Sequence, residues 1–290
     1  MPRVIAKAVL QGTEAPVFTM RMIDRKLRWQ LLRRPPPFPF GLTDKIGMKR
    51  FAEQHGVRVA ETVETLDASQ VSANMLRDRM RHSWPSDFVL KPAHGYQNKQ
   101  TFAVRGGVRD ILRDKEFNLD AAATAIAQDD EFRTYLVEEL LVDERDADSG
   151  VPASLPMDFK FWCFGSHVAH VTIMVNRWRQ SASAYTVAVA DCDAAYTPRP
   201  TWCAIPPDPE SGDVQFVELP PRPHCWDDMV ASARTLGEAV GAFTRIDFYA
   251  TKRGAIFGEF QLLFDLVDWN ANADAAIQRH WRGRDGGGEG

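Results

Sequence analysis

The chain has 290 residues, of which 44% are hydrophobic and 26% are charged, so it can bury a sizeable core and is not a collagen-like, disordered or disulfide-scaffold protein. No run approaches the roughly 20 apolar residues of a transmembrane segment, and the first residues carry no secretory pattern. The four cysteines form no CxxC motif, so we expect reduced thiols and a cytoplasmic protein. A net charge of −4 gives no support to nucleic-acid binding.

The N-terminal part of the chain is strongly basic. Residues 1–50 carry eleven Lys and Arg against three Asp and Glu. Within them, residues 17–34 alternate apolar and basic positions at near-helical spacing and predict an amphipathic helix. This helix packs on the body of the protein or, alternatively, makes peripheral contact with a membrane surface. A proline-rich run follows, so residues 1–40 are expected to be a basic helix and an extended linker.

The remaining elements follow from periodicity, capping residues and turn residues. In chain order the pattern predicts a helix at residues 45–54, a second at 68–81, a hairpin of strands at 88–91 and 101–104, a mostly helical stretch at 108–130 and a strand at 135–141. It then predicts strands at 158–164, 168–175 and 185–189, an irregular proline-rich stretch at 198–223, a helix at 226–240, and two strands at 243–249 and 255–263. This order indicates an α+β fold with mostly antiparallel sheets. We expect two α+β subdomains, at residues 41–135 and 136–283, and a disordered tail at 284–290.

Two stretches in the first half carry chemistry. Lys91 ends a strand before a turn that contains His94 and Gly95, and a lysine beside exposed turn amides can hold phosphate oxygens. The alternatives are a solvated lysine and a histidine that only stabilises the turn. Glu138 and Glu139 lie in an apolar segment, where a carboxylate needs a donor. A nucleotide amino group or ribose hydroxyl would serve, and so would a salt bridge.

Two further stretches lie in the second half. Asp158 and Lys160 share one strand face and form either a ribose-and-phosphate clamp or a surface pair, with Arg177 one strand later as a further cation. Asp247 and Glu259 are expected to face each other from the two strands of a hairpin, where they repel unless a cation lies between them. Mg²⁺ would resolve this repulsion, and the alternative is a structural ion pair with Arg245.

In this order the four stretches resemble the ATP-grasp superfamily, and within it the TupA-like group associated with teichuronopeptide-type cell-surface polymers. Residues 44–51 (DKIGMKRF) look like its "DK" helix opening, and residues 88–95 (FVLKPAHG) are similar to "FVLKxxHG". Residues 158–164 (DFKFWCF) are similar to "DYKFFCF", and residues 245–249 (RIDFY) with 257–259 (FGE) are similar to "RVDLY…FGE". The resemblance covers about residues 41–265.

The resemblance implies an ATP-grasp fold, in which two α+β subdomains clamp ATP. It assigns Lys91, with His94 and Gly95, to the phosphates, Glu138 and Glu139 to the adenine segment, Asp158 to the ribose, Lys160 and Arg177 to the terminal phosphates or the acceptor, Asp247 and Glu259 to Mg²⁺, and Arg245 to the transferred phosphoryl group. The implied activity is that of an ADP-forming ligase, which joins a small-molecule carboxylate to an amine or thiol through an acyl phosphate. Such an activity serves the biosynthesis of a cell-surface polymer or a specialised metabolite.

The sequence departs from the family pattern at two places. Gln261 stands where many members have an asparagine metal ligand, and its longer amide either reaches the metal or packs. The apolar residues 262–269 replace a Pro/Gly/Ser-rich turn that holds anions. Two alternatives therefore stay open, namely a phosphotransferase that acts on a hydroxyl group and a nucleotide-binding protein without turnover.

Overall fold

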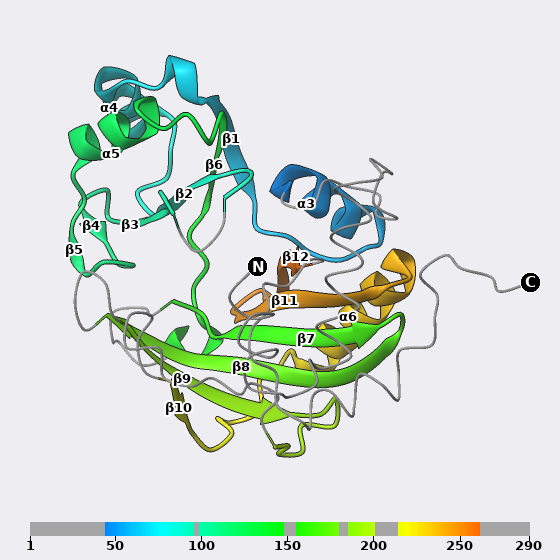
Figure 1. Ribbon diagram of the computed structural model, residues 1–290. Coiled ribbons are helices and arrows are strands. Elements are labelled where there is room, and N and C mark those ends of the chain that lie inside the picture. The colour runs from blue at the N-terminus through cyan, green and yellow to red at the C-terminus, as the bar shows by residue number, and fades with distance from the viewer. Residues whose placement is uncertain (1–43, 96–98, 148–154, 180–184, 201–213, 262–290) are drawn as a thin grey trace, which may run out of the picture. The chain divides into compact units, whose positions relative to one another are not determined.

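The computed structural model describes residues 44–95, 99–147, 155–179, 185–200 and 214–261. The basic segment 17–34, the proline-rich linker and the tail at 284–290 lie outside these ranges. The described residues form two six-stranded sheets with helices, and all but one of the strand pairings described are antiparallel (Figure 1). The α+β class with mostly antiparallel sheets is thereby confirmed. Within the described ranges no helix is long and apolar enough to cross a membrane.

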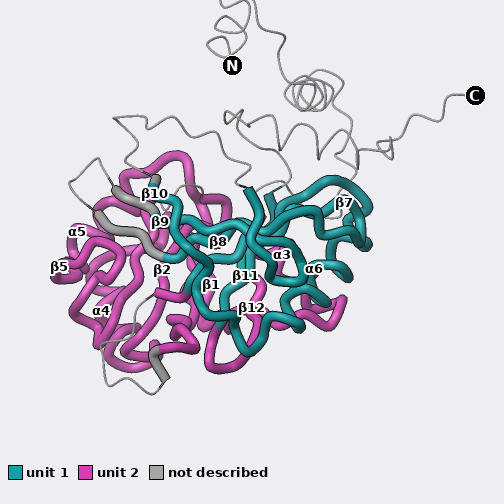
Figure 2. Tube along the Cα trace, turned by 90° about the horizontal axis from the view of Figure 1, so that it is seen from below, with its two compact units in different colours: residues 1–42, 157–250, 258–290 teal, residues 43–156, 251–257 magenta. Residues whose placement is uncertain are grey.

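The chain divides into two compact units, which are coloured separately in Figure 2. Unit 2 comprises Thr43–Pro156 together with Thr251–Phe257, and the described part of unit 1 lies within Met157–Ala250 and after Gly258. The division falls at 156/157, whereas the sequence places it at 135/136. The reason is β6 (Thr134–Glu139), which pairs with both β1 (Thr62–Asp67) and β2 (Phe88–Pro92) and so belongs to the sheet of unit 2.

Unit 2 is built on one antiparallel sheet. In the order in which they lie side by side, its strands are β1, β6, β2, β3 (Phe102–Arg105), β4 (Arg109–Asp110) and β5 (Lys115–Glu116). Its helices are α3 (Lys45–Gln54), α4 (Ala73–His82) and α5 (Leu119–Ala127), and short 3₁₀ helices span Ala68–Gln70 and Glu144–Ala147.

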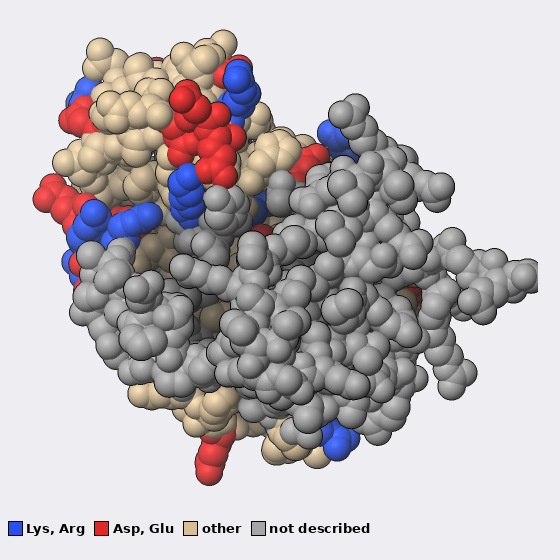
Figure 3. Space-filling view, viewed as in Figure 1, with Lys and Arg blue, Asp and Glu red and all other residues tan. Residues whose placement is uncertain are grey.

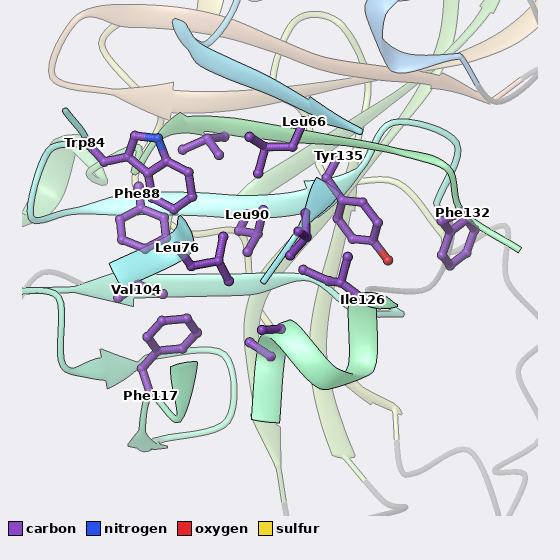
Figure 4. Packing of buried hydrophobic residues seen from close by; sticks show 14 residues of the cluster. Leu66, Leu76, Trp84, Phe88, Leu90, Val104, Phe117, Ile126, Phe132 and Tyr135 are labelled. Atoms are coloured by element: carbon purple, nitrogen blue, oxygen red, sulfur yellow. The ribbon is translucent and has the colours of Figure 1, made fainter. Parts of the chain in front are cut away.

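One face of this sheet carries the hydrophobic core of unit 2. Phe88 and Leu90 of β2 and Tyr135 and Val137 of β6 are completely buried and pack with side chains of α4 and α5 (Figure 4). Because side chains alternate along a strand, the residues between these positions point to the other face. The core thereby determines which side of the sheet Lys91 and Glu138 occupy.

The helix that opens unit 2 forms as predicted. The Asp44 carboxylate accepts a hydrogen bond from the Ile46 amide at 3.1 Å, which caps the first turn of α3. The helix ends before Gly56, whose φ of 73° is the left-handed conformation that favours glycine at a helix end. The hairpin of β2 and β3 is likewise confirmed, since Phe88 pairs with Val104 and Leu90 with Phe102.

Two sequence predictions in unit 2 are wrong, and one strand was missed. Residues 68–72 are not α-helical, because the Ser72 side chain accepts from the Met75 amide at 3.2 Å and starts α4 there. Residues 108–118 form β4, β5 and turns, and the Asp110 carboxylate fixes one turn by accepting from the Leu112 amide at 3.1 Å. Asn118 caps α5 by accepting from the Ala121 amide at 2.8 Å. Strand β1 was not predicted, and a bulge after Thr62 breaks the alternation on which strand prediction depends.

Most of the second sheet lies in unit 1, while its residues Thr251–Phe257 are counted with unit 2. In spatial order its strands are β10 (Val214–Phe216), β9 (Tyr185–Cys192), β8 (His167–Arg179), β7 (Asp158–Phe164), β11 (Phe243–Thr251) and β12 (Gly254–Gln261). The strand β8 extends beyond its predicted end at residue 175, because its polar last residues still pair with β9. The pair of β10 with β9 is the parallel one.

Among the described residues of unit 1, one helix, α6 (Trp226–Val240), packs on one face of this sheet. The Trp226 ring lies 6.1 Å from the ring of Phe159 and 5.4 Å from that of Phe161, measured between centroids. The helix comes so close to the turn between β7 and β8 that a Cβ atom on Gly237 would lie 2.2 Å from the Gly165 carbonyl oxygen. Alternation along β7 then places Asp158, Lys160 and Trp162 on the face away from α6.

The described surface carries charges of both signs close together. In Figure 3, Lys and Arg side chains lie beside Asp and Glu side chains over the region of α4 and α5. Arg77 pairs with Asp120 at 3.2 Å and Arg79 with Glu64 at 3.3 Å. Ion pairs this exposed contribute little to stability. Because positive and negative side chains alternate, the described residues in this view form no extended basic patch.

Candidate functional site

Five charged side chains predicted from the sequence meet on the face of the unit 1 sheet that points away from α6. They come from three neighbouring strands, β7, β11 and β12, and are Asp158, Lys160, Arg245, Asp247 and Glu259. The strand register pairs Asp247 directly with Lys160. The Lys160 ammonium group lies 2.8 Å from Asp247 Oδ2 and 2.5 Å from Asp158 Oδ2.

Arg245 binds the carboxylate of Asp247 through two hydrogen bonds. Its Nε donates to Asp247 Oδ1 at 2.6 Å, and its Nη2 donates to Oδ2 at 2.6 Å. The same Nη2 lies 3.7 Å from Glu259 Oε1. The ion pair that the sequence left open as the alternative to a metal is therefore present, and Arg245 supplies positive charge next to both carboxylates.

The two aspartates of this cluster differ in their protonation behaviour. Burial opposes the charge of Asp247, but Arg245 and Lys160 outweigh it and hold the pKa of this carboxyl below its usual value. The pKa of Asp158 is raised. Burial and the nearby negative charge of Asp247 both raise it, and together they outweigh the attraction of Lys160. Its Oδ1 is also buried without a hydrogen-bond partner among the described residues. An acceptor left in this state is costly, so Asp158 is suited to receive a donor from a ligand.

The donor atoms of the cluster fit Mg²⁺ by their chemistry. Mg²⁺ takes oxygen ligands, usually one or two carboxylates completed by water and phosphate, and Asp247 and Glu259 provide two carboxylates on adjacent strands. The Glu259 side chain is 38% exposed and therefore accessible. Gln261 follows on the same strand face, and its backbone carbonyl accepts from Thr244 Oγ1 at 3.3 Å. Within the described ranges, no three His, Cys, Asp or Glu side chains gather as a ready-made metal site.

Sequence reasoning missed a network of uncharged and charged side chains next to Arg245. The Arg245 guanidinium lies over the Trp162 ring, 5.8 Å from its centroid. The Trp162 indole donates to Thr172 Oγ1 at 3.3 Å, and the Thr172 hydroxyl donates to Asp191 Oδ1 at 2.8 Å. Buried His170 also contacts Asp191 Oδ1, at 2.7 Å. The period of two along β7 could have revealed Trp162, because it places Trp162 on the same face of the sheet as Lys160.

In unit 2, Lys91 and Glu138 lie on neighbouring strands and form an ion pair. Lys91 Nζ lies 2.6 Å from Glu138 Oε2, and Lys49 of α3 lies 2.9 Å from Oε1. Burial opposes the charge of Glu138, but the two lysines outweigh it, so the pKa of Glu138 lies below its usual value. The salt bridge that the sequence offered as the plain alternative is thus present, and Lys49 is a partner that sequence reasoning did not identify.

The remaining predicted residues of unit 2 lie around this pair. Glu139 accepts from the Glu61 amide at 2.7 Å and forms an ion pair with Arg253. His94 is exposed in the turn after β2. Gly95 is buried there, and its carbonyl accepts from Lys45 Nζ at 2.5 Å.

Arg177 lies near the end of β8. It pairs with Val187 of β9. Its expected part in binding the terminal phosphates stays a prediction.

No protein-family model and no curated protein sequence matches the chain. Solved structures similar to it include ligases of amino acids. D-alanyl-alanine synthetase A from Vibrio cholerae is 12% identical with a TM-score of 0.49, over 82% of this chain and 60% of that one. The VanG D-Ala:D-Ser ligase from Enterococcus faecalis is 14% identical with a TM-score of 0.44, over 76% and 52%. The ATP-grasp ligase PsnB is 12% identical with a TM-score of 0.41, over 81% and 60%. This chain thus spans 52–60% of the length of these structures.

Proposed function

We propose that the protein is an ATP-grasp ligase of the TupA-like type, which converts ATP to ADP while it activates a small-molecule carboxylate. The carboxylate oxygen attacks the γ-phosphorus and ADP leaves. An amine or thiol then attacks the acyl carbon, inorganic phosphate leaves, and the nucleophile gives up its proton. The observation that carries this proposal is the gathering of the five motif residues Asp158, Lys160, Arg245, Asp247 and Glu259 on one sheet face.

The charges of this cluster support the use of a metal with the nucleotide. Three carboxylates and two cations give a net charge of −1, which does not attract a triphosphate. A divalent cation held by Asp247 and Glu259, with Gln261 as a third candidate ligand, would neutralise phosphate charge at this place. Lys160 and Arg245 are then positioned to stabilise the transferred phosphoryl group, a task in which fixed charges account for much of the catalysis.

Each part of the nucleotide is assigned to particular residues. We assign the ribose hydroxyls to Asp158, because its buried Oδ1 has no hydrogen-bond partner among the described residues. The phosphates are assigned to Lys91 with the turn at His94 and Gly95, and the terminal phosphate or the acceptor to Arg177. The segment of Glu138 and Glu139 is assigned to the adenine. The resemblance to TupA-like proteins further supports a cytoplasmic enzyme of cell-surface polymer or specialised-metabolite biosynthesis.

A screen for ADP release in the presence of hydroxylamine tests this proposal. Amino acids, uronic acids and other small natural acids serve as candidate substrates, and an activated acid should be trapped as a hydroxamate. The Asp247→Asn protein serves as the inactive control. Hydroxamate formation with ADP release supports the ligase, and ADP release with no hydroxamate from any acid argues against it.

A phosphotransferase that acts on a hydroxyl group is the second candidate. It is favoured by the apolar residues 262–269, which directly follow β12 in the sequence. At this place a ligase of this type has an anion-binding turn. In the same screen it would yield a stable phosphomonoester and no hydroxamate.

A further inference from the structure

The carboxylate of Glu138 lies between two ammonium groups. Lys49 approaches Oε1 from α3 at 2.9 Å, and Lys91 approaches Oε2 from the neighbouring strand at 2.6 Å. The register pairs Lys91 with Leu136, so Lys91 reaches Glu138 diagonally on one face of the sheet. Only 4% of the Glu138 side chain is exposed. A carboxylate this deeply buried must keep a positive partner in every state of the protein.

The two lysines are not equivalent. The Lys49 side chain is 10% exposed, and its ammonium group also donates to Thr62 Oγ1 at 2.6 Å, so it is held at two points. The Lys91 side chain is 22% exposed. Among the residues that the structure describes, its ammonium group is held by Glu138 alone, which leaves two of its three N–H donors for other acceptors. Lys91 is therefore the partner that can leave.

We infer that Lys49 is a positioning residue, the permanent counter-ion of Glu138, and that its presence lets Lys91 exchange Glu138 for the phosphate oxygens of a nucleotide. The inference rests on the proposed function, since the exchange requires a bound phosphate. Without Lys49, the departure of Lys91 would leave a buried carboxylate with no cation, which is strongly unfavourable. Lys91 would then stay with Glu138 and contact the phosphates in only a small fraction of molecules.

The affinity for Mg-ATP of the whole protein, measured by calorimetry, tests this exchange. If Lys49→Met leaves Lys91 available in about one molecule in ten, the apparent Kd rises about tenfold. Removing the carboxylate should then release Lys91 again, so Lys49→Met combined with Glu138→Gln should bind Mg-ATP within about threefold of the Kd of Glu138→Gln alone. Lys91→Met combined with Glu138→Gln should not recover. Lys252→Met removes an exposed lysine of the β11–β12 turn and is the matched control.

A second measurement needs no substitution. Titration with Mg-ATP should shift the ¹⁵N resonance of the Lys91 ammonium group and leave that of Lys49 in place. Equal shifts for both lysines would overturn the inference. A protein with both Lys49→Met and Glu138→Gln that binds Mg-ATP about tenfold more weakly than Glu138→Gln alone would also overturn it, because Lys49 would then act on the nucleotide directly. Failure of the wild type to bind Mg-ATP would overturn the proposed function and this inference together. Binding by the wild type, together with the same loss of affinity from Lys49→Met in the presence and in the absence of the Glu138 carboxylate, would overturn the inference alone.

Discussion

At the scale of single residues, the candidate site consists of buried carboxylates and the cations that compensate them. Glu138 lies between Lys49 and Lys91, and Asp247 between Arg245 and Lys160. Removal of one partner from a buried pair typically costs about 3–5 kcal/mol, because the other charge is left uncompensated. These residues are therefore tied to the stability of each unit as well as to its chemistry, and substitutions that keep the shape of a side chain separate the two effects.

Asp247→Asn and Glu259→Gln each remove one carboxylate charge and keep the shape of the side chain. If these residues bind Mg²⁺, each change should lower the rate of ADP formation by about 100-fold or more, since the metal carries several kcal/mol of charge stabilisation. Circular dichroism should show the native fold in both proteins. Near-normal rates in both would remove the metal assignment and leave the Arg245 pair as a purely structural contact.

The lowered pKa of Glu138 gives the stability a definite dependence on pH. Its usual value is 4.5. Because the folded protein binds the proton more weakly than the unfolded chain, Glu138 stabilises the fold above pH 4.5, and this contribution is lost as the pH falls toward the folded pKa. The difference in unfolding free energy between the wild type and Glu138→Gln, from urea titrations, should be largest near neutral pH and shrink below pH 4.5. An equal difference at pH 7 and pH 3 would contradict the pairing.

At the scale of helices and strands, local signals determine how far the sequence predicts the structure. α3 and α6 are predicted closely because apolar periodicity runs through both helices and each is followed by a glycine with positive φ, Gly56 and Gly241. Residues 108–118 are mispredicted because the turn made by Asp110 depends on a side-chain hydrogen bond that composition does not reveal. In the site, the strand period of two placed Asp158 beside Lys160. It did not reveal Lys49, because the contact of α3 with β6 joins residues 89 positions apart.

Gly237→Ala should destabilise unit 1 strongly, because the new Cβ would lie 2.2 Å from the Gly165 carbonyl oxygen and 3.2 Å from Cys163 Cβ. The neighbour is backbone and cannot rotate away. We expect the free energy of unfolding to fall by about 3 kcal/mol, which is at the upper end of overpacking effects. The fall should appear as a lower urea midpoint. Gly165→Ala is the matched control. A Cβ atom at Gly165 meets nothing within 4 Å. The substitution should therefore cost only the strain of an alanine at a φ of 58°, about 1 kcal/mol of unfolding free energy. Equal losses in the two proteins would show that α6 can move.

At the scale of the whole molecule, the proposed nucleotide residues are divided between two separately packed units. Lys91 and Glu138 belong to unit 2, and Asp158, Lys160 and Asp247 belong to unit 1. Each group is assembled by the sheet of its own unit. A nucleotide that binds the folded form of either unit should stabilise that unit, which gives the proposal a readout that does not depend on turnover.

Mg-ATP should raise the melting temperature of the wild-type protein, because it binds the folded state. At a concentration of 100 times its Kd it adds about 2.7 kcal/mol to the free energy of unfolding. Lys91→Ala removes a proposed phosphate ligand and should reduce this increase to less than half. Lys252→Ala removes an exposed lysine of the β11–β12 turn and should leave the increase unchanged. Differential scanning fluorimetry measures both. Equal losses in the two variants would mean that net charge, and not Lys91, determines the effect.

The position of β6 between β1 and β2 determines when unit 2 can be completed during synthesis. Until residue 139 has been added, β2 lacks its neighbour on that side, and a strand with an open edge is prone to pair with another chain. Unit 2 also includes Thr251–Phe257, so its last segment is made about 110 residues after residue 139, when most of the strands of unit 1 have been made. Native pairing is therefore non-local and is expected to be slow. Pulsed hydrogen exchange should detect protection of β1, β2 and β6 in one common phase, and earlier protection of β2 alone would contradict this order of assembly.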